Sequence, residues 1–127
     1  MSTHCGIAIK TEKGYRTIYC QHDGYPKYML PMLKDNYNSE ELAIKLVGLG
    51  DASFISPRIA PALNESHSFD RPVRDVSVFY HRDRGEPWED TQPAIFSKEE
   101  LLEQFWFAYI WENGQWNAYE DGEVVVR

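Results

Sequence analysis

Cysteine is scarce in this chain, and the two that are present, Cys5 and Cys20, show no repeated spacing. The beginning of the chain has no basic segment followed by an apolar one, so we expect no secretory signal peptide. No run of residues approaches the roughly 20 apolar residues that a membrane-spanning helix needs. These absences predict reduced thiols, a cytoplasmic location and no association with a membrane.

Positive charge is also in the minority. The chain has 20 Asp and Glu residues against 13 Lys and Arg residues, which gives a net charge of -7. Such a surface repels phosphate backbones, so we expect no direct binding of nucleic acid. The aromatic run at residues 105–111 lacks interleaved basic residues, which favours core or protein-interface packing over base stacking. The acidic charge suits docking onto a basic protein surface, or serves solubility alone.

Familiar catalytic motifs are missing as well. The sequence shows no Ser-His-Asp triad pattern, no phosphate-binding glycine-rich loop and no zinc-protease helix. We therefore expect no cofactor and favour a non-enzymatic role, while enzymatic activity is left open.

The chain does contain the pattern of an α+β fold, in one domain over residues 1–127. Residues 5–11 and 15–21 flank a glycine-containing turn and predict a hairpin. Asn113-Gly114 predicts a second hairpin, and residues 73–80 predict a central strand between the two. We expect an antiparallel sheet of about five to six strands with two to three helices on one face.

Helix signals lie between the two hairpins and before the second one. Residues 25–37 have helical apolar spacing, with Pro31 marking either the beginning of the helix or a kink. Ser39 is a predicted N-cap, and Ser97 opens a capping-box pattern. Residues 51–72 show no periodicity and predict a long loop, of a length that is often functional.

Polar chemistry is densest at residues 81–86, after the predicted central strand. If this backbone is extended, Arg82 and Arg84 point to one side, and His81 and Asp83 to the other. Two guanidinium groups on one side suit a phosphate or carboxylate. The alternative is a solvated surface on which Asp83 and Glu86 pair with the arginines.

Three histidines and an aspartate suggest further hypotheses. Asp23 or His67 could act as a general base, although Asp23 before a glycine is also an ordinary turn. A two-residue hairpin loop places Cys5 opposite Cys20, with His4 and His22 nearby, a conceivable metal site. Buried free thiols are the more common use of cysteine, and we predict no metal.

Several of these segments match a group of small phage, prophage and bacterial proteins, which the chain resembles. The matching segments, which span about two-thirds of the chain, are Met1-Ser2-Thr3, Ile18-Tyr19-Cys20, Asp23-Gly24-Tyr25-Pro26, Leu49-Gly50-Asp51, His67-Ser68-Phe69 and Tyr80-His81-Arg82-Asp83-Arg84-Gly85-Glu86. The resemblance implies a mobile-element setting, and it supports the cluster at residues 81–86 as a site. It implies no reaction. We predict a ligand or partner site that consists of Asp23, Tyr25, His67, His81, Arg82, Asp83, Arg84 and Glu86.

Our leading hypothesis is a phage-type accessory protein that binds and inhibits a host protein of a defence system. CRISPR and nucleotide-signalling systems are the expected targets, and the location would then be the cytoplasm of the host cell. The alternative is a small domain that binds a nucleotide or another anionic ligand, with or without catalysis. A homodimer is left open.

Overall fold

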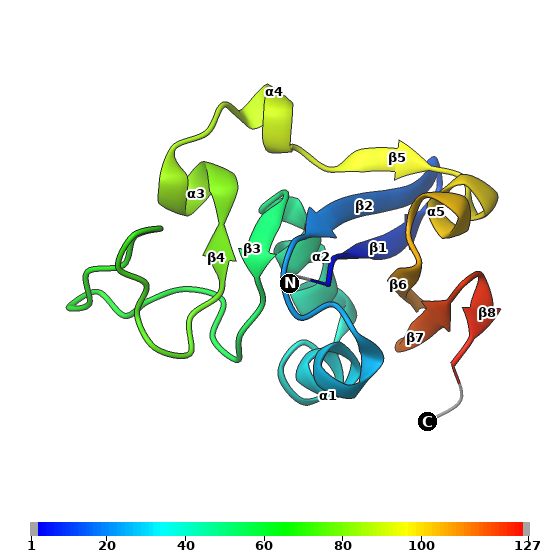
Figure 1. Ribbon diagram of the computed structural model, residues 1–127, viewed down its shortest axis with the longest axis horizontal. Helices are drawn as coiled ribbons and strands as arrows, with labels where there is room; N and C mark the ends of the chain where they lie inside the picture. Colours follow the sequence, from blue (N-terminus) through cyan, green and yellow to red (C-terminus); the bar gives the residue numbers. More distant parts are fainter. Residues whose placement is uncertain (1–2, 126–127) are drawn as a thin grey trace.

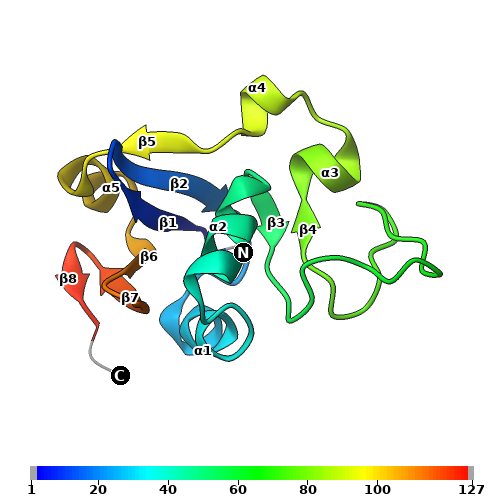
Figure 2. The ribbon, with the colours of Figure 1, turned by 180° about the vertical axis from the view of Figure 1, so that it is seen from behind.

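The computed structural model describes residues 3–125, which form a mixed β-sheet flanked by helices (Figures 1 and 2). The strands are β1 (Cys5–Thr11), β2 (Gly14–Cys20), β3 (Ala52–Phe54), β4 (Val78–Phe79), β5 (Ala94–Phe96), β6 (Phe107–Glu112), β7 (Gln115–Glu120) and β8 (Glu123–Val124). The helices are α1 (Pro26–Asn36), α2 (Glu40–Gly48), α3 (Tyr80–Arg84), α4 (Trp88–Thr91) and α5 (Lys98–Gln104). None of these described helices is long and apolar enough to cross a membrane.

The sheet has eight strands in the order β4-β3-β2-β1-β6-β7-β8, with β5 paired beside β2. Both predicted hairpins, β1–β2 and β6–β7, are confirmed as antiparallel pairs. However, β1 runs parallel to β6, and β2 parallel to β3. The expectation of a purely antiparallel sheet of five to six strands is therefore wrong, because the long connections return the chain in the same direction as its neighbour.

The turn of the second hairpin is determined by its own two residues. Asn113 and Gly114 have φ angles of 56° and 75°. Two successive residues with positive φ are what a two-residue hairpin turn requires, and Asn-Gly tolerates them best. Asp121-Gly122 followed by Val124-Val125-Val126 likewise predicts a turn into a final strand, and the turn leads into β8, which ends at Val124. Val126 and Arg127 lie outside the described residues.

Two apolar clusters lie on opposite faces of the sheet. Ile7 and Ile9 of β1 are buried in a cluster that includes the apolar side chains of α1 and α2. Ala8, between them, points to the other face and is buried with Leu101 of α5. Alternate residues of one central strand therefore serve two cores. Helices packed on one face only were expected, and this expectation is wrong, because β1 is buried on both sides.

The predicted helix caps are confirmed. The Ser39 hydroxyl accepts a hydrogen bond from the Leu42 N–H at 3.1 Å and caps α2. Ser97 and Glu100 form a reciprocal capping box at the beginning of α5. Helix α1 begins at Pro26 and continues through Pro31. Pro31 lies on the exposed face, where water can bond the carbonyl that lacks a partner.

The region of the predicted central strand differs most from expectation. Val78–Phe79 forms the two-residue strand β4, Val76 makes an isolated parallel bridge to Arg58, and Tyr80–Arg84 forms the short helix α3. Between β3 and β4, residues 55–77 form a long loop that projects from one end of the molecule (Figure 1). This loop and α3 together contain most of the predicted site residues.

Candidate functional site

Helix α3 separates the two arginines that were expected to act together. Residues two apart in a helix lie on different sides, since each residue turns the chain by about 100°. The Arg82 side chain is only 25% exposed, whereas the Arg84 side chain is 54% exposed. The condition for placing both guanidinium groups on one side, an extended backbone at residues 81–84, is therefore not met.

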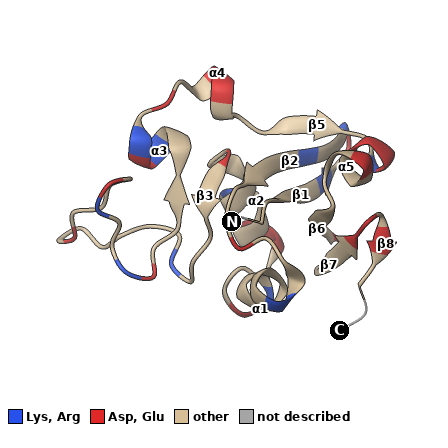
Figure 3. Cartoon of the chain, viewed as in Figure 1, with Lys and Arg blue, Asp and Glu red and all other residues tan. Residues whose placement is uncertain are grey.

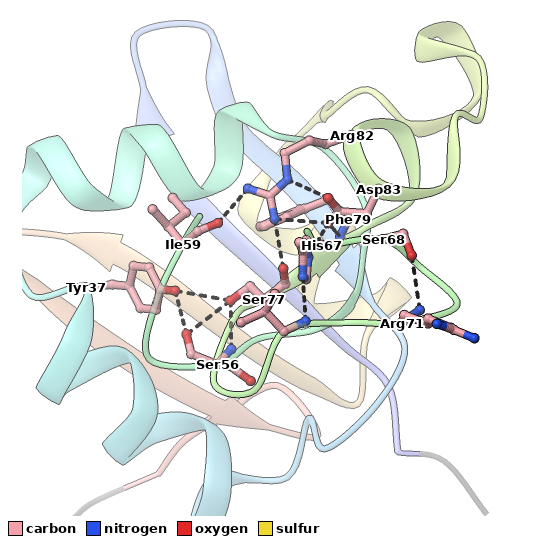
Figure 4. Close-up of polar contacts among 11 residues, drawn as sticks. Tyr37, Ser56, Ile59, His67, Ser68, Arg71, Ser77, Phe79, Arg82 and Asp83 are labelled. Carbon is pink, nitrogen blue, oxygen red and sulfur yellow. Dashed lines mark hydrogen bonds and ion pairs between the residues drawn. The ribbon is translucent and has the colours of Figure 1, made fainter. Parts of the chain in front are cut away.

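The Arg82 guanidinium is bonded within the chain on all of its nitrogens (Figure 4). Its Nε and Nη2 donate to the two carboxylate oxygens of Asp83 at 2.9 and 3.0 Å. Its Nη1 donates to the Ile59 carbonyl at 2.5 Å, and its Nη2 also donates to the Ser77 carbonyl at 2.8 Å. Arg82 thus joins α3 to both ends of the loop.

Asp83 lies at the centre of this arrangement. Its Oδ2 accepts a hydrogen bond from the Phe79 N–H at 2.8 Å, and its side chain is 4% exposed. Burial raises the pKa of Asp83, but the hydrogen bonds from Arg82 and Phe79 and the Arg82 charge outweigh it. The pKa of Asp83 therefore lies below its ordinary value, and the group stays ionised as the partner of Arg82.

His67 brings the tip side of the loop to the same carboxylate. Its Nδ1 accepts a hydrogen bond from the Val73 N–H at 2.9 Å, so the neutral ring has its proton on Nε2. The Nε2 atom lies 3.3 Å from Asp83 Oδ2, with the side chain 2% exposed. This contact does not form a hydrogen bond, and Nε2 has no hydrogen-bond partner among the described residues. The attraction between the two groups is electrostatic.

The contacts of Arg82, Asp83 and His67 determine which chemistry this cluster of three side chains can perform. A general base needs a lone pair that faces the reacting group. The Nδ1 lone pair of His67 already accepts a hydrogen bond from the Val73 N–H. The Asp83 oxygens already accept hydrogen bonds from Arg82 and Phe79. The geometry thus favours a structural role, in which the cluster fixes the loop to α3, over general acid–base catalysis.

The exposed side of α3 borders a shallow hollow of about 360 Å³. The hollow is lined by Ser68, Phe69, Asp70, Asp83 and Arg84. The Arg84 guanidinium lies 4.6 Å from the centre of the Phe69 ring, and its Nη1 is 3.6 Å from a Glu86 carboxylate oxygen. Of residues 81–86, the exposed His81 and Arg84 and the partly exposed Glu86 are therefore the side chains that can contact a ligand or partner.

The remaining predicted site residues are divided between two places. Asp23 and Tyr25 are exposed and immediately precede α1. In the described part of the chain, no hydrogen bond or ring contact links either of them to α3. His81 lies on the exposed side of α3, where its Nδ1 is 2.7 Å from the Glu86 carbonyl and its ring contacts Trp88. The eight predicted residues thus do not form one constellation.

The two thiols lie where the hairpin register predicts. Cys5 is paired with Cys20 across β1 and β2, and both are free and buried. Burial and the neighbouring Cys20 raise the pKa of the Cys5 thiol well above its ordinary value, which makes it a poor nucleophile. The His4 ring packs against Tyr19. Among residues 3–125, no three His, Cys, Asp or Glu side chains are grouped as metal ligands.

A second anchor of the loop has no signal in the sequence. The Tyr37 hydroxyl donates to the Ser56 carbonyl at 2.6 Å and contacts the Ser77 hydroxyl at 3.2 Å (Figure 4). The Ser56 N–H donates to the Ser77 hydroxyl at 2.7 Å. Isolated serines are frequent in loops, so only the folded chain shows that these two are buried and fix the loop to α1.

Asp51 belongs to a further set of contacts that involves α3. It lies in the segment Leu49-Gly50-Asp51, which the resemblance includes. Its carboxylate accepts a hydrogen bond from the Tyr19 N–H at 2.9 Å. Burial raises the pKa of Asp51, the Tyr19 bond lowers it, and the Glu86 charge raises it, so the net direction is upward. Beside it, the Tyr80 hydroxyl donates to the Gln21 side chain. Together these groups connect α3 to the end of β2.

Comparison with protein-family models, curated proteins and solved structures gave no match for this chain. The resemblance to phage and prophage proteins stays a prediction.

Proposed function

We propose that this chain is a non-enzymatic binding protein that inhibits a host protein, and that its target belongs to a phage-defence system such as a CRISPR or nucleotide-signalling system. The observation that supports this best is the way in which the loop at residues 55–77 is held. Its anchors, which include His67 and Ser77, are buried, while most of its other side chains face solvent.

Such an arrangement is suited to recognition. Long loops without secondary structure cost conformational entropy, and in compact proteins they are commonly binding segments positioned by a rigid scaffold. Leu63, near the tip, is fully exposed. One exposed apolar side chain is ordinary by itself, so Leu63 supports the proposal only through its place on the long exposed loop, where a partner can reach it.

The hydrogen bonds of the polar network also favour a binding role over a catalytic one. The Arg82 guanidinium, which an anion clamp would need, is bonded to Asp83, Ile59 and Ser77. The His67 lone pair that a general base would need is bonded to Val73. The phage setting and the cytoplasm of the host cell as location belong to the proposal through the sequence resemblance.

Expression of the chain in bacteria with a defined defence system is expected to raise the plating efficiency of a restricted phage. Leu63→Asp should reduce this effect and weaken co-purification with the defence protein by about tenfold, because it places a charge at the buried centre of the interface. Its melting temperature should stay unchanged, because Leu63 contacts solvent only.

The matched control is Ile44→Asp, an equal change at a half-exposed position of α2, which should keep binding. Failure of the wild-type chain to alter plating against every system tested, with no defence protein co-purified, would count against the proposal.

One observation favours a second candidate, a small anionic ligand such as a nucleotide. Arg84 is exposed and stacks on Phe69 beside the 360 Å³ hollow, and a cation next to an aromatic ring can contact a phosphate and a base together. Nucleotides, cyclic dinucleotides and ADP-ribose should then raise the melting temperature, and Arg84→Ala should abolish the shift while Arg71→Ala preserves it. No shift with any of these ligands would remove this candidate.

A further inference from the structure

A second hollow, of about 400 Å³, lies beside β7 and β8, at the opposite end of the molecule from the long loop (Figure 1). It is lined by Trp106, Glu120, Asp121, Glu123, Val124 and Val125. Neither the predicted site nor the proposed loop interface includes any of these residues, so the hollow needs an explanation of its own.

The apolar lining of this hollow is unusually exposed. Trp106 is 55% exposed and Val124 is 61% exposed. They are two of only six large apolar side chains that are exposed among the described residues. One exposed apolar side chain is ordinary, but a tryptophan and a valine that share a hollow form a patch of the kind that binds partners.

The backbone around the hollow is held in place. The Asp121 N–H donates to the Trp106 carbonyl at 2.8 Å, which ties the β7–β8 turn to the residue before β6. The Val125 N–H donates to the Ala118 carbonyl at 2.8 Å. The indole therefore projects from a fixed support, and a partner would not have to order it before binding.

The rim of the hollow is acidic. Glu120, Asp121 and Glu123 are all exposed, and none of them forms an ion pair with a described residue. Figure 3 shows this negative charge along β7 and β8. Like charges gathered around a hollow strengthen the local potential and attract groups of the opposite sign.

We propose that this hollow binds an arginine or lysine side chain from an extended basic segment of a partner protein. The indole face of Trp106 attracts a cation through its ring electrons, and the aliphatic stem of the same side chain packs against Val124. The three carboxylates pair with its charged end and with neighbouring basic residues. Nucleic acid and acidic peptides are repelled by the same charges. This inference is independent of the loop interface.

The test uses the full chain and a blocked hexapeptide of alternating arginine and glycine. Titration calorimetry should detect binding that weakens as salt rises, because exposed charges are screened. Trp106→Ala should weaken binding by about tenfold. The combined change Glu120→Gln, Asp121→Asn and Glu123→Gln should weaken it at least as much. Asparagine is chosen because Asp121 has a φ of 51°, which asparagine tolerates.

The matched control neutralises three exposed acids elsewhere, Glu89→Gln, Glu99→Gln and Glu103→Gln, and reaches the same net charge. It should bind the peptide as the wild type does. Equal losses in both triple variants would show attraction by net charge alone and overturn the proposal. Unchanged binding by Trp106→Ala, in a chain with a wild-type circular dichroism spectrum, would also overturn it.

Sedimentation of the wild-type chain tests whether a second copy of the chain occupies the hollow instead. A dimer that Trp106→Ala dissociates would mean that a second copy fills the hollow, and the basic segment would be the wrong partner. A monomer that binds the peptide supports the proposal. Failure of the phage-plating experiment leaves this result unaffected, since the two surfaces lie at opposite ends of the molecule.

Discussion

Asp83→Ala is expected to lower the free energy of unfolding by about 3 kcal/mol, because breaking a buried ion pair leaves the remaining charge without a partner. In this chain the Arg82 guanidinium would lose two hydrogen bonds, and the Phe79 N–H would lose its acceptor. The loss should be measured by urea denaturation. Faster proteolysis within residues 55–77 should accompany it, because Arg82 and His67 would no longer fix the loop.

The control for this variant is Arg84→Ala on the same helix. Arg84 is exposed, and its contact with Glu86 at 3.6 Å is a surface pair, so its removal should change stability by less than about 0.5 kcal/mol. Equal stabilities of Asp83→Ala and Arg84→Ala would show that the buried network does not hold the loop.

The pH dependence of the free energy of unfolding, compared between the wild-type chain and Asp83→Ala, gives a second measurement. The pKa of Asp83 is lower in the folded chain than its ordinary value of 3.8. A carboxyl group of this kind stabilises the fold above the unfolded pKa, and the contribution is lost as pH falls through the folded pKa. The stability difference between wild type and Asp83→Ala should therefore be constant near neutral pH and shrink below about pH 4.

Gly50→Ala should also be strongly destabilising, by about 3 kcal/mol, from left-handed backbone strain and overpacking combined. Gly50 has a φ of 85°, and a Cβ there would lie 2.5 Å from the Thr91 carbonyl oxygen and 3.0 Å from the Trp88 ring. For a chain of this length the loss corresponds to a fall in melting temperature of about 10 °C.

Gly85→Ala separates the two causes. Gly85 has a φ of 80°, but no atom lies within 4 Å of the place where its Cβ would stand. This variant should therefore show the backbone cost alone, about 1 kcal/mol. A melting temperature for Gly50→Ala no lower than that for Gly85→Ala would mean that α4 moves aside without cost.

Local features of the fold could be predicted from the sequence because neighbouring residues determine them. The turn at Asn113-Gly114, the caps at Ser39 and Ser97, and the pairing of Cys5 with Cys20 all depend on residues close together in the chain. The turn and the caps need only a backbone preference or a hydrogen bond within a few residues, and the cysteine pairing follows from the register that the short loop between β1 and β2 imposes.

Long-range features could not be predicted in this way. No local pattern indicates that β1 pairs with β6 about 100 residues later. The same applies to the site: alternating charge at residues 81–86 fits an extended strand as well as a helix. Arg82 turns inward because the Ile59 and Ser77 carbonyls meet it there, which depends on the path of the loop.

The parallel pairing of β1 with β6 has a consequence for synthesis of the protein. The hairpin of β1 and β2 can form as soon as it leaves the ribosome, since its contacts are local. The other edge of β1, with Ile7 and Ile9, stays open until residues 107–112 have been made. During that interval the nascent chain exposes an unpaired apolar strand edge, the kind that pairs with other chains. Slow translation through α4 and α5 should therefore raise aggregation, and chaperone binding to the first strand should suppress it.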